Sequence, residues 1–146
     1  LHELWDFFTA LPATVVVDHM GRPDVSKPID GPEFALFLKF MREHGNVWSK
    51  VSCPERLSST GPKALDGEHA AYRDVVPFAR RVVEAFPDRV LWGTDWPHPN
   101  LKDHMPDDGL LVDFIPHIAP TAELQHKLLV ANPMRLYWPE ELGSVR

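Results

Sequence analysis

Four polar residues of this sequence, His19, Arg56, Asp95 and His98, each follow closely on an apolar stretch. A carboxylate beside imidazoles can take a proton from water, and an imidazole can polarise a carbonyl group. A guanidinium group can hold a carboxylate through two parallel hydrogen bonds. If these side chains meet in space, they predict hydrolysis of an ester or lactone that itself bears a carboxylate.

Imidazole and carboxylate groups also bind zinc and manganese, so His19 and Asp95 are candidate metal ligands. Two ligands do not suffice for such a site, and the sequence leaves open a metal-dependent hydrolase or decarboxylase. Cys53 is the only cysteine, which excludes an intrachain disulfide and a multi-thiolate metal centre. We expect Cys53 to be a small buried side chain and not a nucleophile.

Three short apolar runs must position the polar residues. They cover residues 14–17, 46–52 and 90–92, and they are too brief for helices. Each is predicted to be a buried parallel strand that delivers its polar residue at the carboxyl end. Because parallel strands end on one face, His19, Arg56, Asp95 and His98 are expected to lie together.

Helices are predicted between and around the strands, at residues 1–11, 30–44, 69–86 and from Thr121 to Asn132. This order indicates βαβ units with a parallel sheet, which an open sheet or a barrel segment would both satisfy. No glycine-rich GxGxxG or P-loop sequence follows a strand, which weakens a nucleotide-binding interpretation.

Several residues are predicted to begin, bend or end these helices. Asp30 is expected to cap the second helix with Glu33 at capping-box spacing, and Pro77 to kink or split the third. Thr121 is expected to cap the last helix, and Asn132 with Pro133 to end it. Residues 58–67, rich in Ser, Thr, Gly and Pro, are predicted to form a surface loop, either a lid or a passive insertion.

The composition is that of one soluble domain of 146 residues with a net charge of −6. Basic residues are interleaved with acidic ones, so neither a nucleic acid nor a membrane is expected as a partner. The amino terminus has no signal-peptide pattern, and the single cysteine fits a reducing compartment, so a cytoplasmic location is expected. The chain begins with Leu1, and we expect it to be a fragment.

Three stretches and the tail of this sequence resemble a known family. They are Val16-Val17-Asp18-His19-Met20-Gly21-Arg22-Pro23, Trp48-Ser49-Lys50-Val51-Ser52, Trp92-Gly93-Thr94-Asp95-Trp96-Pro97-His98 and Asn132-Pro133-Met134-Arg135-Leu136-Tyr137. They resemble the later strands and closing segment of the amidohydrolase superfamily, in its 2-pyrone-4,6-dicarboxylate lactonase-like branch. The similarity covers nearly the whole chain.

The resemblance implies that residues 1–146 are a single partial domain, the carboxyl-terminal portion of a (β/α)8 TIM-type barrel with about three parallel strands and flanking helices. It implies that Asp95 activates water, that His19 helps polarise the carbonyl of a small anionic lactone from aromatic breakdown, and that Arg56 and His98 contact the substrate. It further implies no metal or other cofactor, with a divalent metal such as zinc as the alternative.

The family's His-x-His pair on the first strand has no counterpart in this sequence. We therefore expect that the amino-terminal half of the barrel is needed for a complete site and that the isolated chain is inactive. A third hypothesis follows from the same gap, that the chain is a non-catalytic half-barrel module.

Overall fold

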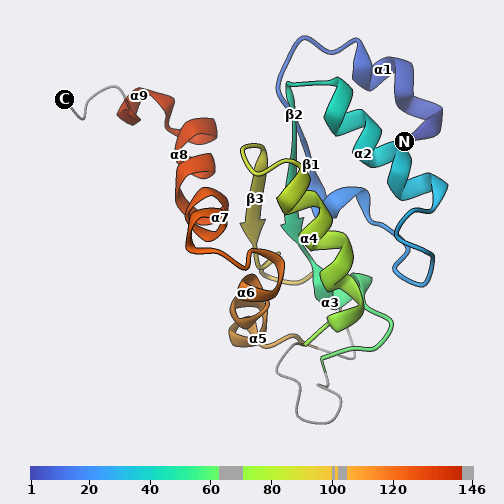
Figure 1. Cartoon of the computed structure of the whole chain (residues 1–146), viewed down its shortest axis with the longest axis vertical. Coiled ribbons are helices and arrows are strands. Elements are labelled where there is room, and N and C mark those ends of the chain that lie inside the picture. Colours follow the sequence, from blue (N-terminus) through green and yellow to red (C-terminus); the bar gives the residue numbers. More distant parts are fainter. Residues whose placement is uncertain (63–70, 100, 102–104, 143–146) are drawn as a thin grey trace.

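The computed structural model describes residues 1–62, 71–99, 101 and 105–142 (Figure 1). Its sheet has three parallel strands in the order β1 (Val15–Val17), β2 (Val47–Ser52) and β3 (Val90–Gly93). Val16 lies beside Trp48 in the register of the first pair, and Val51 beside Trp92 in that of the second. The predicted α/β fold with three parallel strands is confirmed.

Helices connect the strands and follow the last one. Before β1 lie η1 (His2–Leu4) and α1 (Trp5–Thr9), and after it the short turn η2 (Asp18–Gly21) and α2 (Pro32–Glu43). After β2 lie α3 (Pro54–Leu57), η3 (Arg73–Val75) and α4 (Val76–Ala85). After β3 come α5 (Asp108–Asp113), α6 (Ile115–Ile118), α7 (Ala122–His126), the π-helical η4 (Lys127–Ala131), α8 (Asn132–Tyr137) and α9 (Pro139–Leu142).

The core lies where α2 and α4 pack against β2 (Figure 1). The apolar face predicted for α2 is buried, and Phe40 adds to it with 1% of its surface exposed. Phe78 of α4 meets Phe34 of α2 edge-on, with ring centroids 5.0 Å apart. Because each buried Phe contributes about 2–3 kcal/mol, this contact stabilises the packing of both helices against the sheet.

Two predicted helix signals are wrong. Gly31 and not Asp30 caps α2, because the Gly31 amide donates to the Pro28 carbonyl at 2.8 Å and turns the Asp30 side chain out to 83% exposure. Pro77 lies in the first turn of α4, where its missing N–H costs nothing, so the helix begins at Val76 and is not split.

The last helix is capped as predicted but does not end where predicted. The Thr121 hydroxyl accepts the Leu124 amide at 3.2 Å. The helix then passes Asn132 and Pro133 through the π-helical turn η4, whose wider spacing accommodates the missing Pro133 N–H. The buried Asn132 amide donates to the Pro87 and Val90 carbonyls at 2.8 Å each, which ties α8 to the start of β3.

Part of the predicted loop at residues 58–67 is described, up to residue 62; residues 63–67 lie outside the described residues. The Asp74 carboxylate accepts hydrogen bonds from Ser58, Ser59 and Thr60, with the shortest at 2.5 Å. Burial raises the pKa of Asp74, but these hydrogen bonds outweigh it and hold the pKa below 3.8. One carboxylate therefore anchors the described start of the loop to η3.

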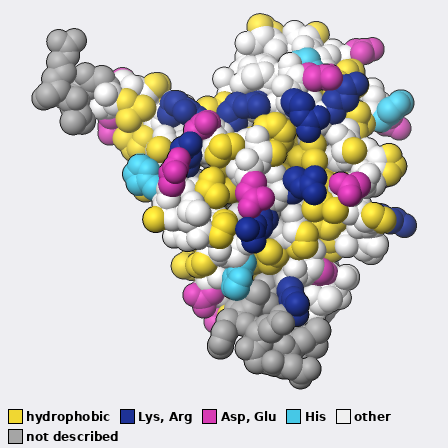
Figure 2. All heavy atoms as spheres, in the orientation of Figure 1, with side chains coloured by type: hydrophobic (Ala, Val, Ile, Leu, Met, Phe, Trp, Pro, Cys, Tyr) yellow, Lys and Arg dark blue, Asp and Glu magenta, His cyan; other side chains and the backbone are white. Residues whose placement is uncertain are grey.

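Acidic and basic side chains alternate on the face shown in Figure 2, with apolar atoms between them. Within the described residues, no helix combines the length and the apolar character that crossing a membrane requires.

The Asp74 anchor gives a pH-dependent prediction. Asp74→Ala removes the shared acceptor, and we expect the free energy of unfolding at pH 7 to fall by about 1–2 kcal/mol. Because the folded pKa is lowered, the contribution is complete above the unfolded pKa and is lost as the pH falls through the folded value. Urea unfolding of both proteins from pH 7 to pH 3 measures this.

The control is Asp24→Ala, since the exposed Asp24 carboxylate accepts hydrogen bonds from Ser26 alone among the described residues. It should destabilise the protein less than Asp74→Ala. A difference between wild type and Asp74→Ala that stays constant down to pH 3 would contradict the anchor.

Candidate functional site

The polar residues that follow the three strands lie at the carboxyl-terminal end of the sheet. His19 lies in η2 directly after β1, Arg56 lies in α3 after β2, and Asp95 follows β3 by two residues. His19 and Asp95 have φ angles of 53° and 68°, in the left-handed region that costs a non-glycine residue about 1–2 kcal/mol. Such strain persists where surrounding contacts fix the backbone, as they do here.

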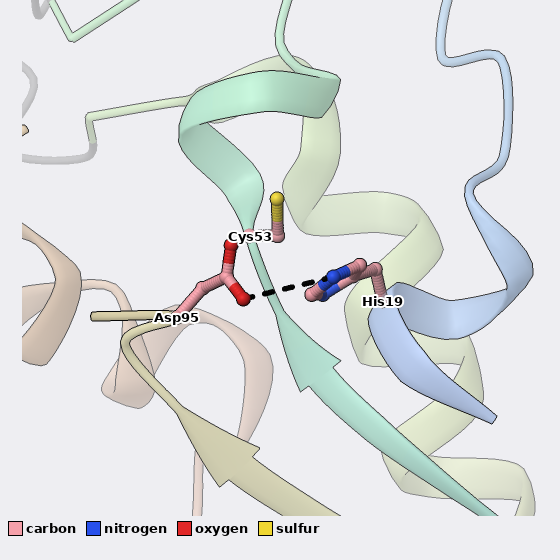
Figure 3. Close-up of side chains that lie close together, drawn as sticks. All are labelled: His19, Cys53 and Asp95. Atoms are coloured by element: carbon pink, nitrogen blue, oxygen red, sulfur yellow. Dashed lines mark ion pairs between the residues drawn. The ribbon is translucent and has the colours of Figure 1, made fainter. Parts of the chain in front are cut away.

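Arg56 contacts residues that follow each of the three strands. Its Nη2 atom lies 2.5 Å from Asp95 Oδ2 and 3.2 Å from His19 Nε2, and its Nε lies 2.7 Å from Cys53 Sγ. His19 Nε2 and Asp95 Oδ1 are 3.7 Å apart, and in Figure 3 the two side chains point toward one another with Cys53 beside them. The predicted meeting is confirmed for His19, Arg56 and Asp95, but not for the side chain of the fourth residue, His98.

The hydrogen bonds fix the proton position of a neutral His19. A guanidinium group has only donors, so His19 Nε2, which faces it, must be the acceptor. The ring proton is then on Nδ1, which lies 2.8 Å from Ser52 Oγ and donates to it. Ser52 was not among the residues predicted for the site, although its place at the end of β2 could have identified it.

His98 lies apart from this cluster. Its side chain is 3% exposed, with Nε2 at 3.2 Å from Asp108 Oδ1 and Nδ1 at 3.5 Å from Glu55 Oε1. The structure therefore places His98 against two carboxylates, while its role as a substrate contact stays a prediction. Glu55 was also missed, because an acidic residue beside a predicted substrate-binding arginine gives no distinctive sequence signal.

Burial changes the acidity of two groups in the cluster. Desolvation of Cys53, together with the nearby Glu55 carboxylate, raises the pKa of the thiol to about 12 despite the contact with Arg56. For Arg56, burial acts to lower the pKa, but the hydrogen bond to Cys53 and the charge of Asp95 raise it. Arg56 is therefore a permanent cation, and Cys53 is an uncharged thiol at neutral pH.

His19, Cys53 and Asp95 each offer a ligand atom, and these atoms lie within 4.8 Å of one another. Arg56, however, contacts all three and takes the place that a cation would occupy between them. In this arrangement the three residues fit a resident metal ion poorly.

Comparison with known proteins places this cluster in context. A family model described as amidohydrolase matches residues 1–138. The 2-pyrone-4,6-dicarboxylate hydrolase of Comamonas testosteroni is 89% identical over 97% of this chain and 47% of its own length. The 4-sulfomuconolactone hydrolase of Hydrogenophaga intermedia is 37% identical over 99% of this chain and 45% of its own length.

A crystal structure of an Agrobacterium tumefaciens protein, 30% identical in sequence, superposes with a TM-score of 0.74. The superposition covers 94% of this chain and 46% of that one. The chain thus spans about half the length of the relatives that it matches, and its three parallel strands with flanking helices match part of a (β/α)8 barrel.

The Cys53 environment gives a direct chemical test. With a pKa of about 12, about one thiol in 10,000 is ionised at pH 8, against roughly a quarter for an exposed cysteine. We expect a disulfide reagent such as DTNB to label native protein at least about 1,000-fold more slowly than urea-unfolded protein. The native rate should rise about tenfold per pH unit between pH 7 and pH 10, and rapid labelling of native protein would contradict this assignment.

Proposed function

This chain belongs to the amidohydrolase family, and on that premise we propose that it supplies the carboxyl-terminal half of a lactone hydrolase. The proposed substrate is a small lactone that bears carboxylates, such as 2-pyrone-4,6-dicarboxylate. We propose that this lactone is an intermediate in the breakdown of aromatic compounds, including lignin. The 89% identical relative named for that hydrolysis supports this choice.

One observation carries the proposal: a carboxylate, an imidazole and a guanidinium group lie within hydrogen-bonding reach at the carboxyl ends of parallel strands. In barrels of this kind that end of the sheet holds the active site. The side chains of Arg56 and Asp95 are 14% and 19% exposed, so the cluster is accessible from this side and yet mostly shielded from water.

In the proposed reaction, Asp95 accepts a proton from a water molecule while the water oxygen attacks the lactone carbonyl carbon. The carbonyl oxygen gains negative charge, which the nearby donors stabilise. The ring C–O bond then breaks, and the leaving ring oxygen takes up the proton that Asp95 accepted, which regenerates the carboxylate. The product is the ring-opened acid, and all atoms of the water are retained.

Arg56 is proposed to bind a substrate carboxylate, although it holds Asp95 in the structure. Four of its five N–H groups donate, to Asp95, His19, Cys53 and, at 3.4 Å, the Pro99 carbonyl. The second N–H of Nη1 has no partner in the described part of the chain, and it is the donor first available to an incoming carboxylate.

His19 is proposed to polarise the lactone carbonyl, which requires a proton on Nε2. A neutral His19 carries that proton when Nδ1 accepts a hydrogen bond from the Ser52 hydroxyl, which can donate as well as accept. This tautomer removes the Nε2 acceptor that faces Arg56, and its loss favours movement of Arg56 toward the substrate carboxylate. The two proposed roles therefore support one another.

The other half of the barrel is the proposed partner. β1 and β3 are the edges of the described sheet, and a cavity of about 460 Å³ lined by apolar side chains of β1 and α2 lies beside one edge. Unpaired strand edges are covered in native proteins, and in a closed barrel further strands cover them. We also propose a cytoplasmic location, consistent with a single free cysteine.

A metal-dependent hydrolase or decarboxylase is the second candidate, favoured by the closeness of His19, Cys53 and Asp95. Metal analysis of the full-length protein separates the two candidates. Stoichiometric zinc with chelator-sensitive activity supports the second, and full activity after chelation supports the first. If the full-length protein hydrolyses no lactone, the non-catalytic half-barrel module remains.

Asp95→Asn tests the general base in the full-length protein. An amide cannot accept the proton of water, so kcat for 2-pyrone-4,6-dicarboxylate hydrolysis should fall about 100-fold or more. The matched control is Asp113→Asn, because Asp113 is an exposed carboxylate at the end of α5. Equal rates for wild type and Asp95→Asn would overturn the assignment.

A further inference from the structure

Glu55 and His98 form a buried pair that the proposed chemistry does not use. The Glu55 side chain is fully buried, and that of His98 is 3% exposed. Both Glu55 oxygens and His98 Nδ1 lack a hydrogen-bond partner among the described residues, with Nδ1 3.5 Å from Oε1. A carboxylate buried without hydrogen bonds opposes folding, so its presence calls for a physical reason.

The position of the pair supplies that reason. Glu55 is next to Arg56 in α3, and the Arg56 guanidinium holds the Asp95 carboxylate at 2.5 Å. The His98 amide donates to the Asp95 carbonyl at 2.8 Å. Side-chain and backbone contacts thus form a closed ring from Asp95 to Arg56, Glu55, His98 and back to Asp95.

The backbone of the turn shows why such a ring is needed. Asp95 and His98, at its two ends, both have φ angles in the left-handed region, 68° and 57°. Non-glycine residues keep this conformation only where neighbours over-determine it. The Glu55–His98 pair attaches the far end of the turn to α3, while the Arg56–Asp95 pair attaches the near end.

We propose that Glu55 and His98 are positioning residues, a buried acid–imidazole pair that locks the turn of residues 95–98 to α3 and so holds the Asp95 carboxylate in place for its reaction. The proposal rests on the proposed function of Asp95 as the base. It also gives His98 a role other than direct contact with the substrate. Asp108 contacts the other nitrogen of His98: its half-exposed carboxylate lies 3.2 Å from Nε2.

The test uses Glu55→Gln in the full-length protein with 2-pyrone-4,6-dicarboxylate as substrate. Gln keeps the shape of Glu and removes its charge. We expect kcat to fall about 10- to 100-fold with KM changed less than about threefold, because the reacting carboxylate shifts while the substrate contacts remain. The matched control is Glu84→Gln, whose exposed carboxylate pairs with Arg80 on the surface of α4 and should leave the rate unchanged.

A double variant separates positioning from a general loss of structure. A positioning residue acts through Asp95, so Glu55→Gln should change the residual rate of Asp95→Asn by less than about twofold. If Glu55→Gln lowers kcat by the same factor in the wild-type protein and in Asp95→Asn, the role of Glu55 is structural and the proposal is overturned. Should Glu55→Gln fail to fold, Glu55→Asp, which keeps the charge, enters the same cycle with the same expected pattern.

The remaining outcomes are also decisive. A normal kcat for Glu55→Gln with an inactive Asp95→Asn overturns the pair and leaves the proposed function standing. A raised KM for His98→Gln with a normal Glu55→Gln restores His98 as a substrate contact. An unchanged rate for Asp95→Asn overturns the proposed function itself, whatever the Glu55 variants do.

Discussion

The ion pair between Arg56 and Asp95 is the interaction on which the rest of the site depends. It joins the ends of β2 and β3, and the same guanidinium group reaches His19 after β1. Because the pair is mostly shielded from water, removing either partner leaves an uncompensated charge, which is more costly than losing a surface salt bridge. Three short strands are thereby held in one arrangement at the end where chemistry is proposed.

The same pair creates a tension in the proposed mechanism. While Arg56 holds Asp95, the Asp95 oxygen in that contact is less available to water, and Arg56 is less available to a substrate. A substrate carboxylate that draws Arg56 away would relieve both effects at once. The Glu55–His98 pair then keeps the Asp95 turn attached to α3 while Arg56 changes partners.

The sequence predicted the strands and the meeting of His19, Arg56 and Asp95. Hydrophobic patterning identifies the strands, and parallel topology brings the residues that follow them to the same end of the sheet. The sequence did not predict Ser52 or Glu55, since their roles depend on the side chains opposite them in space. Asp30 and Pro133 were misinterpreted for a different reason: a local turn at Pro28 and a π-helical turn override the usual helix signals.

The central claim is that Asp95 activates water and does not itself attack the lactone. A single turnover of the full-length enzyme in ¹⁸O-labelled water, followed by mass spectrometry of the product and of the peptide that contains Asp95, tests this most directly. A general base predicts one ¹⁸O atom in the new product carboxylate and none in Asp95. Label in the Asp95 carboxylate would reveal a covalent acyl intermediate and would contradict the account.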